Sequence, residues 1–280
     1  MEHEIREFRT LEEYRECVAL QEEVWGEGFA ERVPVAILRV AQRLGGVAAG
    51  AYDSQRRLVA FVFGLTGIQE GRPVHWSDML AVRPGLRDSG LGRRLKLYQR
   101  EVLLAAGVRR MLWSFDPLES RNAHLNLERL GVVAREYVHD MYGQSDSPLH
   151  RGIGTDRLIA LWELDAPRVS RRIEGRAEPT PSTHEGGVAV VLDGRTLEGT
   201  DPIPGAPRLE EEVRRISVAI PADIHGIRER NLELAREWRE ATRSALDHYL
   251  ARGWEVQGLT RSGTLSRYLL VREGRGPSEE

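Results

Sequence analysis

The sequence predicts an α/β protein in two parts, a larger one over residues 1–165 and a smaller one over residues 188–273. Three observations lead to this fold class. An apolar strand, His75–Val82, runs through a glycine-bearing turn into a helix. Strands and helices alternate along the first part, and a strand, helix, strand, strand order follows in the second. Such alternation is typical of α/β domains.

The first part begins with a short strand and two helices. The pattern Thr10-Leu11-Glu12-Glu13 has the form of a capping box, in which a hydroxyl and a carboxylate each accept from an early amide. Pro34 opens the second helix, and Gly45-Gly46 ends it. The strands expected before the glycine turn are Ile5–Phe8, Val47–Tyr52, Leu58–Leu65 and His75–Val82.

The glycine turn precedes a helix whose apolar residues recur every three or four positions from Leu91. The helix therefore begins near Gly90, and its first amides have no intrahelical acceptor. With the positive end of the helix dipole behind them, these amides form a site for an anion such as a pyrophosphate. The alternative is an ordinary strand–turn–helix connection that needs glycines for its geometry. Three arginines add positive charge around the turn: Arg87, Arg93 and Arg94.

The hexapeptide Arg87-Asp88-Ser89-Gly90-Leu91-Gly92 resembles the Arg/Gln-x-x-Gly-x-Gly/Ala signature of the GNAT acyltransferases. The element order of residues 3–165 is similar to that family, and Trp113–Gly131, WSFDPLESRNAHLNLERLG, is similar to one group of its predicted acetyltransferases. The resemblance implies a mixed, twisted sheet flanked by helices, with the pantetheine arm of acetyl-CoA or another acyl-CoA inserted between two splayed strands. It implies these cofactor-binding positions: Leu80, Ala81, Val82, Arg87, Asp88, Ser89, Gly90, Leu91, Gly92, Arg93 and Asn122.

The smaller part resembles the second half of a GNAT domain, repeated. Residues 166–187 are rich in Arg, Pro, Ser, Thr and Gly and are expected to form a linker or wrapping segment, whereas residues 274–280 are expected to be a disordered tail. One long helix is expected over Asp223–Arg252. Pro221–Gly226 reads PADIHG and lacks the glycine signature, so this degenerate half domain is expected to bind no coenzyme A. It would instead complete a sheet, cap the acceptor site or form a homodimer contact.

Composition excludes several classes of protein. The formal net charge is −3 and no long basic block occurs, which argues against a nucleic-acid-binding protein. No apolar run reaches membrane-spanning length and the first residues are charged, so we expect a cytoplasmic protein with no membrane partner. Cys17 is the only cysteine, which excludes an intrachain disulfide and a cysteine-based metal site, and we expect no metal. Lys96 is the only lysine among 40 basic residues.

An acyltransferase of this type needs an oxyanion donor and a base that removes a proton from the attacking amine. The resemblance implies that a backbone amide near Leu80–Val82 donates to the thioester carbonyl. Asp78 stands at a place where many GNAT enzymes carry a carboxylate, and it is the candidate base, although relatives tend to have a histidine near this position. A surface or capping role for Asp78 remains the alternative.

The usual leaving-group acid of the family is a tyrosine four residues before the glycine that closes the next helix. In this chain the glycine matches Gly131 and the tyrosine position is Leu127, so the usual acid is missing. His124, Tyr137 and Tyr142 are the candidates to replace it, and the thiolate can also leave unaided because a free thiol has a pKa of about 8.5.

Three charged residues are candidates for recognising the acceptor: Asp116, Asp156 and Arg157. An aspartate would bind an ammonium and an arginine a carboxylate, which would suit an amino acid or another small amine. Surface ion pairing explains the same residues, and a succinyl group on the donor would also use an arginine. We therefore consider an N-acyltransferase acting on a small-molecule amine and, alternatively, a catalytically weakened member that binds acyl-CoA as a sensor or assembly module. A nucleotide-binding protein is disfavoured because Gly-Lys-Ser/Thr is absent.

Overall fold

A computed structural model describes residues 3–27, 29, 31–143, 152–181 and 187–272. The chain forms two compact units, which are described separately. Unit 1 comprises Met1–Trp113 and Trp162–Ala166, and unit 2 comprises Ser114–Leu161 and Pro167–Glu280. The division falls within strands β5 (Arg110–Phe115) and β7 (Arg157–Glu163). Residues 114–161 therefore group with the C-terminal part of the chain.

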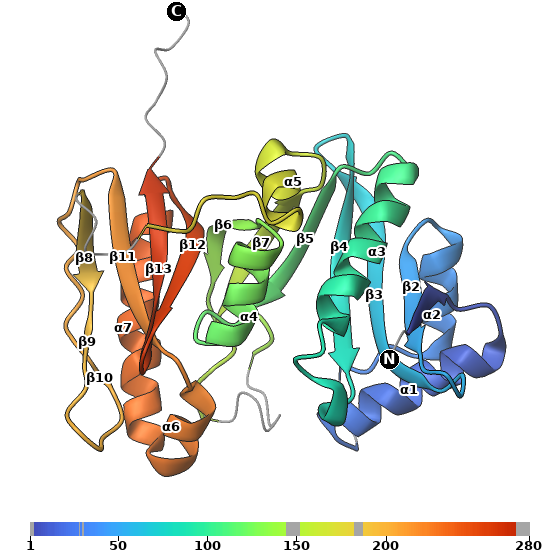
Figure 1. Cartoon of the computed structure of the whole chain (residues 1–280), viewed down its shortest axis with the longest axis horizontal. Helices are drawn as coiled ribbons and strands as arrows, with labels where there is room; N and C mark the ends of the chain where they lie inside the picture. The colour runs from blue at the N-terminus through green and yellow to red at the C-terminus, as the bar shows by residue number, and fades with distance from the viewer. Residues whose placement is uncertain (1–2, 28, 30, 144–151, 182–186, 273–280) are drawn as a thin grey trace, which may run out of the picture. The chain divides into compact units, whose positions relative to one another are not determined.

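Unit 1 contains a mixed sheet flanked by helices, as the sequence predicts (Figure 1). The strand order is β1-β2-β3-β4-β5; the first four strands pair antiparallel, and β4 and β5 pair parallel. The helix that follows β4 begins after Gly90, as expected. The elements of this unit, besides β5, are β1 (Glu4–Glu7), α1 (Leu11–Trp25), α2 (Val35–Arg43), β2 (Val47–Tyr52), β3 (Leu58–Gln69), β4 (Arg72–Val82), η1 (Pro84–Leu86) and α3 (Leu91–Ala105).

Helices α1 and α2 pack together over one face of this sheet. The expected capping box is present: Thr10 accepts from the Glu13 amide, and the Glu13 carboxylate accepts from the Thr10 amide. Met79 and Ala81 of β4 lie in the apolar core with residues of α1 and α2. Helix α3 packs on the opposite face, because neighbouring residues of a strand point to opposite sides and Leu80 lies against α3 at Gly92.

In unit 2 the strands follow the order β7-β6-β12-β13-β11-β8, and among these pairs only β11–β8 is parallel. The remaining elements of unit 2 are α4 (Ser120–His124), the π-helical turn η2 (Leu125–Arg129), β6 (Val133–Val138), α5 (Pro167–Ile173), β8 (Val188–Leu192), β9 (Gly194–Arg195), β10 (Ile203–Pro204), β11 (Arg215–Pro221), α6 (Ile224–Arg230), α7 (Leu232–Leu250), β12 (Trp254–Ser262) and β13 (Leu265–Arg272).

Two expectations about this region need correction or qualification. The single helix expected over Asp223–Arg252 is two helices, because Asn231 is extended, with φ −152° and ψ 91°, and its side chain caps α7 by accepting from the Leu234 amide. The segment 166–187 contains helix α5. The tail expected at residues 274–280 lies outside the described residues.

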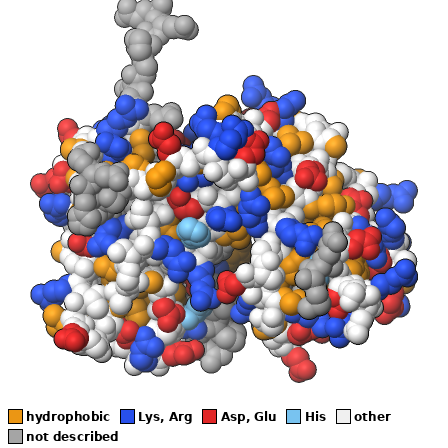
Figure 2. All heavy atoms as spheres, viewed as in Figure 1, with side chains coloured by type: hydrophobic (Ala, Val, Ile, Leu, Met, Phe, Trp, Pro, Cys, Tyr) orange, Lys and Arg blue, Asp and Glu red, His pale blue; other side chains and the backbone are white. Residues whose placement is uncertain are grey.

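Basic and acidic side chains lie next to one another over much of the face shown in Figure 2, in keeping with the formal net charge of −3. None of the described helices is both long enough and apolar enough to cross a membrane.

Candidate functional site

Strand β4 carries a β-bulge near its middle. Phe63 of β3 pairs with Met79 and Leu65 pairs with Trp76, so two residues of β4, Ser77 and Asp78, oppose the single residue Gly64. Gly64 is required here, because a Cβ on it would lie 2.2 Å from the His75 imidazole. The bulge reverses the alternation of the strand, so that Ser77 and Leu80 both lie on the face covered by α3.

The same part of β4 loses its pairing with β5. The two strands pair only at His75 with Met111 and at Trp76 with Leu112, and no further pair joins them in the part of the chain that the structure describes. Towards the C-terminal end of β4, from Ser77 to Val82, the edge that faces β5 is therefore open. An open strand edge presents backbone donors and acceptors to a ligand.

Helix α3 begins at the end of this open edge, after the short turn η1. Its N-cap residue is Gly90, in the left-handed conformation with φ 81°, and as a glycine it has no side chain to cap the helix. Ser89 does not serve as a cap, because its hydroxyl donates to the Leu86 carbonyl at 2.6 Å. By contrast, Thr10, Asp223 and Asn231 cap α1, α6 and α7 with their side chains. Gly90 thus supplies no cap of its own, and a helix N-terminus of this kind can bind an anion.

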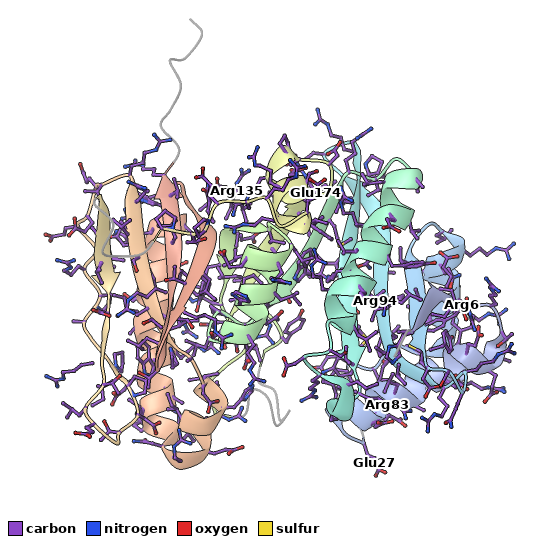
Figure 3. All side chains as sticks on the ribbon, in the orientation of Figure 1. Arg6, Glu27, Arg83, Arg94, Arg135 and Glu174 are labelled. Atoms are coloured by element: carbon purple, nitrogen blue, oxygen red, sulfur yellow. The ribbon has the colours of Figure 1, made fainter. Side chains whose placement is uncertain are left out.

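The arginines around the turn differ in their engagement. Figure 3 labels Arg94, on α3, and Arg83, just after β4. Arg94 donates from Nη2 to the His3 carbonyl at 2.8 Å, and Arg83 pairs with Glu23 at 3.1 Å. Arg87 is exposed and enters none of the ion pairs formed among the described residues. Arg87 is therefore suited to move onto a ligand.

Asp78 lies in the bulge, where the strand edge opens. Its side chain reaches solvent, yet the protein around the carboxyl raises its pKa above the ordinary value, and a hydrogen bond with Trp76 opposes that shift. A solvent-accessible carboxylate with a raised pKa has the properties of a general base. The sequence analysis predicts an oxyanion donor near Leu80–Val82, whereas the irregular backbone of β4 lies at Ser77–Asp78.

A buried polar group that the sequence analysis missed lies beside the bulge, on the α3 face. Lys96 of α3 donates from Nζ to Ser77 Oγ at 2.8 Å, and the same Nζ lies 3.7 Å from the centre of the Trp113 ring. Lys96 is only 5% exposed. The available signal was compositional: this is the one lysine of the chain.

Ser77 continues the network into the core. Its hydroxyl lies 2.9 Å from Gln99 Oε1, and Gln99 Nε2 lies 2.9 Å from His75 Nε2. Thr66 Oγ1 lies 2.9 Å from the other ring nitrogen of His75, and it donates to the Gly45 carbonyl. Burial, with a smaller contribution from Lys96, lowers the pKa of His75 to about 3, so the imidazole is neutral at ordinary pH.

Unit 2 brings the expected acceptor residues together, but it also supplies partners for them from α7. Arg239 Nη2 donates to Asp116 Oδ2 at 2.7 Å. Arg243 forms a bidentate ion pair with Asp156, in which Nε and Nη2 each lie 2.8 Å from a carboxylate oxygen. Burial raises the pKa of both aspartates, but Arg239 for Asp116 and Arg243 for Asp156 more than offset this and hold each pKa below its ordinary value.

Asp116 and Asp156 therefore each have a guanidinium partner even in the absence of a ligand. Arg157 is buried, donates from Nη1 to the Asp156 carbonyl at 2.8 Å, and stacks over the Tyr142 ring. The sequence analysis missed Arg239 and Arg243, because nothing in a helical stripe shows which residues of another strand it will meet.

The candidates for the leaving-group acid also lie in unit 2. The Tyr137 hydroxyl donates to Asp156 Oδ2 at 2.6 Å, and burial, reinforced by Asp156, raises its pKa. His124 is half-buried, its Nδ1 has no hydrogen-bond partner, and burial lowers its pKa. Leu127 is fully buried, and Asn122 is exposed on α4.

Other features of the described residues give no further site. No group of three or more His, Cys, Asp or Glu side chains in the described ranges is arranged to hold a metal ion. An open pocket of about 580 Å³ lies between β1, α1 and α2, and none of the predicted site residues lines it.

Comparison with known protein families and with curated proteins gives no match. Solved structures that are similar to the chain include acetyltransferases. The ribosomal-protein-S18-alanine N-acetyltransferase from Escherichia coli is 16% identical over 59% of this chain and 96% of its own, with a TM-score of 0.45. An N-acetyltransferase from Staphylococcus aureus Mu50 is 11% identical over 59% of this chain and 100% of its own, with a TM-score of 0.47. A chain of the NatC complex, bound to Gag peptide and CoA, is 13% identical over 58% of this chain and 99% of its own, with a TM-score of 0.47.

Proposed function

We propose that the protein is an N-acyltransferase that moves an acetyl or other short acyl group from acyl-CoA to the amine of a small molecule such as an amino acid. The observation that carries this proposal is the combination in unit 1 of a bulged β4, an open β4 edge and a glycine N-cap on α3. An extended ligand with a pyrophosphate at Gly90 could lie along the open edge and reach the bulge. The span from Val82 to Ser77 is about 17 Å for an extended strand.

The acyl-CoA would then be held mainly by backbone. The first amides of α3 would bind the pyrophosphate, and Arg87 would add charge. In the proposed reaction the amine nitrogen attacks the thioester carbonyl carbon, the carbon–sulfur bond breaks, and the coenzyme A thiol leaves. A backbone amide at the Ser77–Asp78 bulge would donate to the developing oxyanion.

Asp78 is the residue proposed to take the proton from the attacking amine, because it lies at the bulge and its pKa is raised. No leaving-group acid is assigned, since the Tyr137 hydroxyl already donates to Asp156. Asp116, Asp156 and Arg157 remain the proposed acceptor residues. Because both aspartates pair with arginines of α7, their proposed role is to orient guanidinium groups. These guanidinium groups would bind a carboxylate of the acceptor.

The proposal is tested first by binding. Thermal unfolding is measured with coenzyme A, acetyl-CoA, succinyl-CoA, ATP and NAD, because a ligand that binds only the folded state raises the melting temperature. The double variant Arg87→Glu, Gly90→Asp should lose the shift with coenzyme A esters. The matched control is Arg43→Glu, Gly45→Asp, since Arg43 is also exposed and Gly45 also has a positive φ, of 86°. Equal loss in both variants, or no shift with any ester, would refute the proposed site.

A second candidate function is favoured by one observation. Leu127 is fully buried at the position where the family resemblance leads us to expect a tyrosine acid, which suits a protein that binds acyl-CoA without fast turnover. Thiol release from acyl-CoA across a panel of amines distinguishes the two. Turnover that depends on an amine supports the enzyme, and binding without turnover supports a sensor or assembly module.

A further inference from the structure

Lys96 lies at the closed end of the open β4 edge. It donates to Ser77, the first residue of β4 beyond the last pair with β5, and its Nζ lies over Trp113, the first residue of β5 beyond that pair. Lys96 therefore bridges the two strands at the level where they separate. A ligand that follows the open edge from Gly90 would end at this amine.

The direction of each hydrogen bond in the network can be deduced. Thr66 gives its hydrogen to the Gly45 carbonyl, so a neutral His75 must donate from Nδ1 to Thr66 and accept at Nε2. Gln99 must then present its nitrogen to His75 and its oxygen to Ser77. The hydrogen of Ser77 is consequently committed to Gln99, and Ser77 can only accept from Lys96.

No counter-charge accompanies the amine. β4 supplies Ser77 and neutral His75, α3 supplies Gln99, and β5 supplies the Trp113 ring; among the described residues no carboxylate lies within 4.0 Å of Lys96 Nζ. Burial lowers the pKa of Lys96 well below its ordinary value, which favours loss of its proton in the absence of a ligand. The aromatic face and the hydroxyl are nevertheless groups that favour an ammonium.

We propose that Lys96 recognises an acyl group that ends in a carboxylate, so that the preferred donor is a dicarboxylic acyl-CoA such as succinyl-CoA or malonyl-CoA. This inference rests on the proposed function, because it places the acyl end of the donor at the closed end of the β4 edge. A carboxylate there would supply the missing counter-ion, and Lys96 would take up a proton and bind it as an ammonium. The other two hydrogens of the ammonium would point to Ser77 Oγ and to the Trp113 ring.

Arginine could not serve in this way. The chain uses arginine at the other 39 of its 40 basic positions, yet lysine stands here. A guanidinium keeps its charge at every physiological pH and would be buried without a counter-ion whenever the ligand is absent, whereas an amine can lose its proton. Only lysine can therefore respond to burial by losing its proton.

The test is isothermal titration calorimetry at pH 8 with coenzyme A, acetyl-CoA and succinyl-CoA, on the wild-type protein and on Lys96→Met. In the wild-type protein we expect succinyl-CoA to bind at least about tenfold more tightly than acetyl-CoA, as for other buried charge pairs. Titrations in two buffers of different ionisation enthalpy should show uptake of about one proton with succinyl-CoA and none with acetyl-CoA. Lys96→Met should bind both esters equally.

Each contrary result has a distinct meaning. If acetyl-CoA binds as tightly as succinyl-CoA, with no proton uptake, the inference about Lys96 is wrong and the proposed function stands. If no ester binds, the proposed function and the inference both fall. Intact-mass analysis after incubation with either ester gives a third outcome: a stable acyl group on Lys96 would make it a nucleophile and overturn its role in recognition. The proton-uptake and selectivity measurements use the wild-type protein, so they decide the question even if Lys96→Met does not fold.

Discussion

Arg239 of α7 donates a hydrogen bond of 2.7 Å to Asp116, which follows β5, and the two residues are only 4% and 5% exposed. They are 123 residues apart in the chain, so this pair holds together distant parts of unit 2. Both charges depend on each other, because neither reaches water. Removing Arg239 leaves the buried Asp116 with a more distant cation, Arg157 at 3.9 Å, and removing Asp116 deprives the buried Arg239 of this counter-charge.

We therefore predict that Asp116→Asn and Arg239→Met each lower the free energy of unfolding by about 3–5 kcal/mol. The matched control is Glu233→Gln, which breaks an exposed pair with Arg236 on the same helix and should cost less than about 1 kcal/mol. Urea unfolding at pH 7 measures all three. Equal losses for the buried and the exposed pair would show that the Asp116–Arg239 pair does not hold unit 2 together.

The buried imidazole of His75 predicts acid sensitivity. Its pKa is about 3 in the folded protein and 6.5 for the free side chain, so between these values the unfolded chain binds more protons. Stability should therefore be complete above pH 6.5 and should fall as the pH is lowered, by about 1.4 kcal/mol per unit for this group.

Urea unfolding of wild type and His75→Gln at intervals from pH 7 to pH 4 measures this effect. The variant should be less stable at pH 7, since it changes the contacts to Gln99 and Thr66, but its stability should fall less steeply with acid. Parallel curves for the two proteins would mean that His75 does not control the acid response.

Gly90 has a positive φ of 81°, which other residues adopt at a cost. We predict that Gly90→Ala destabilises the protein by about 1–2 kcal/mol and that Gly90→Asn costs less, because asparagine tolerates the left-handed conformation. Gly92→Ala is the control, since its Cβ would lie 3.4 Å from Leu80 Cδ2, an ordinary contact. Thermal unfolding of the three variants is the measurement, and a Gly92→Ala loss as large as that of Gly90→Ala would contradict this explanation.

If Asp78 is the base, Asp78→Asn should lower the rate of amine-dependent thiol release by about 10²–10⁴-fold. In the wild-type protein the rate should rise with pH through the raised pKa of this carboxyl. Trp76→Phe removes the hydrogen bond that lowers that pKa, so its rate profile should move to higher pH. Profiles that coincide for wild type, Asp78→Asn and Trp76→Phe would assign the base to another group.

Much of the local structure follows from the sequence, because it depends on neighbours in the chain. The capping box at Thr10 and the start of α3 at Gly90 rest on local hydrogen bonding and glycine conformation. The break at Asn231 was not predicted, although asparagine is a good N-cap, because the apolar stripe continues on both sides.

The site depended more on tertiary structure. Sequence alone predicted an anion-binding turn over Arg87–Gly92 and named Asp78, but it could not place the bulge, which appears only when β3 fixes the register of β4. It also could not join Lys96 to Trp113 or Arg239 to Asp116, since a periodic pattern tells which face of a helix is buried and not what that face meets. Local chemistry was thus set by the sequence, and the pairing of distant charges was decided by packing.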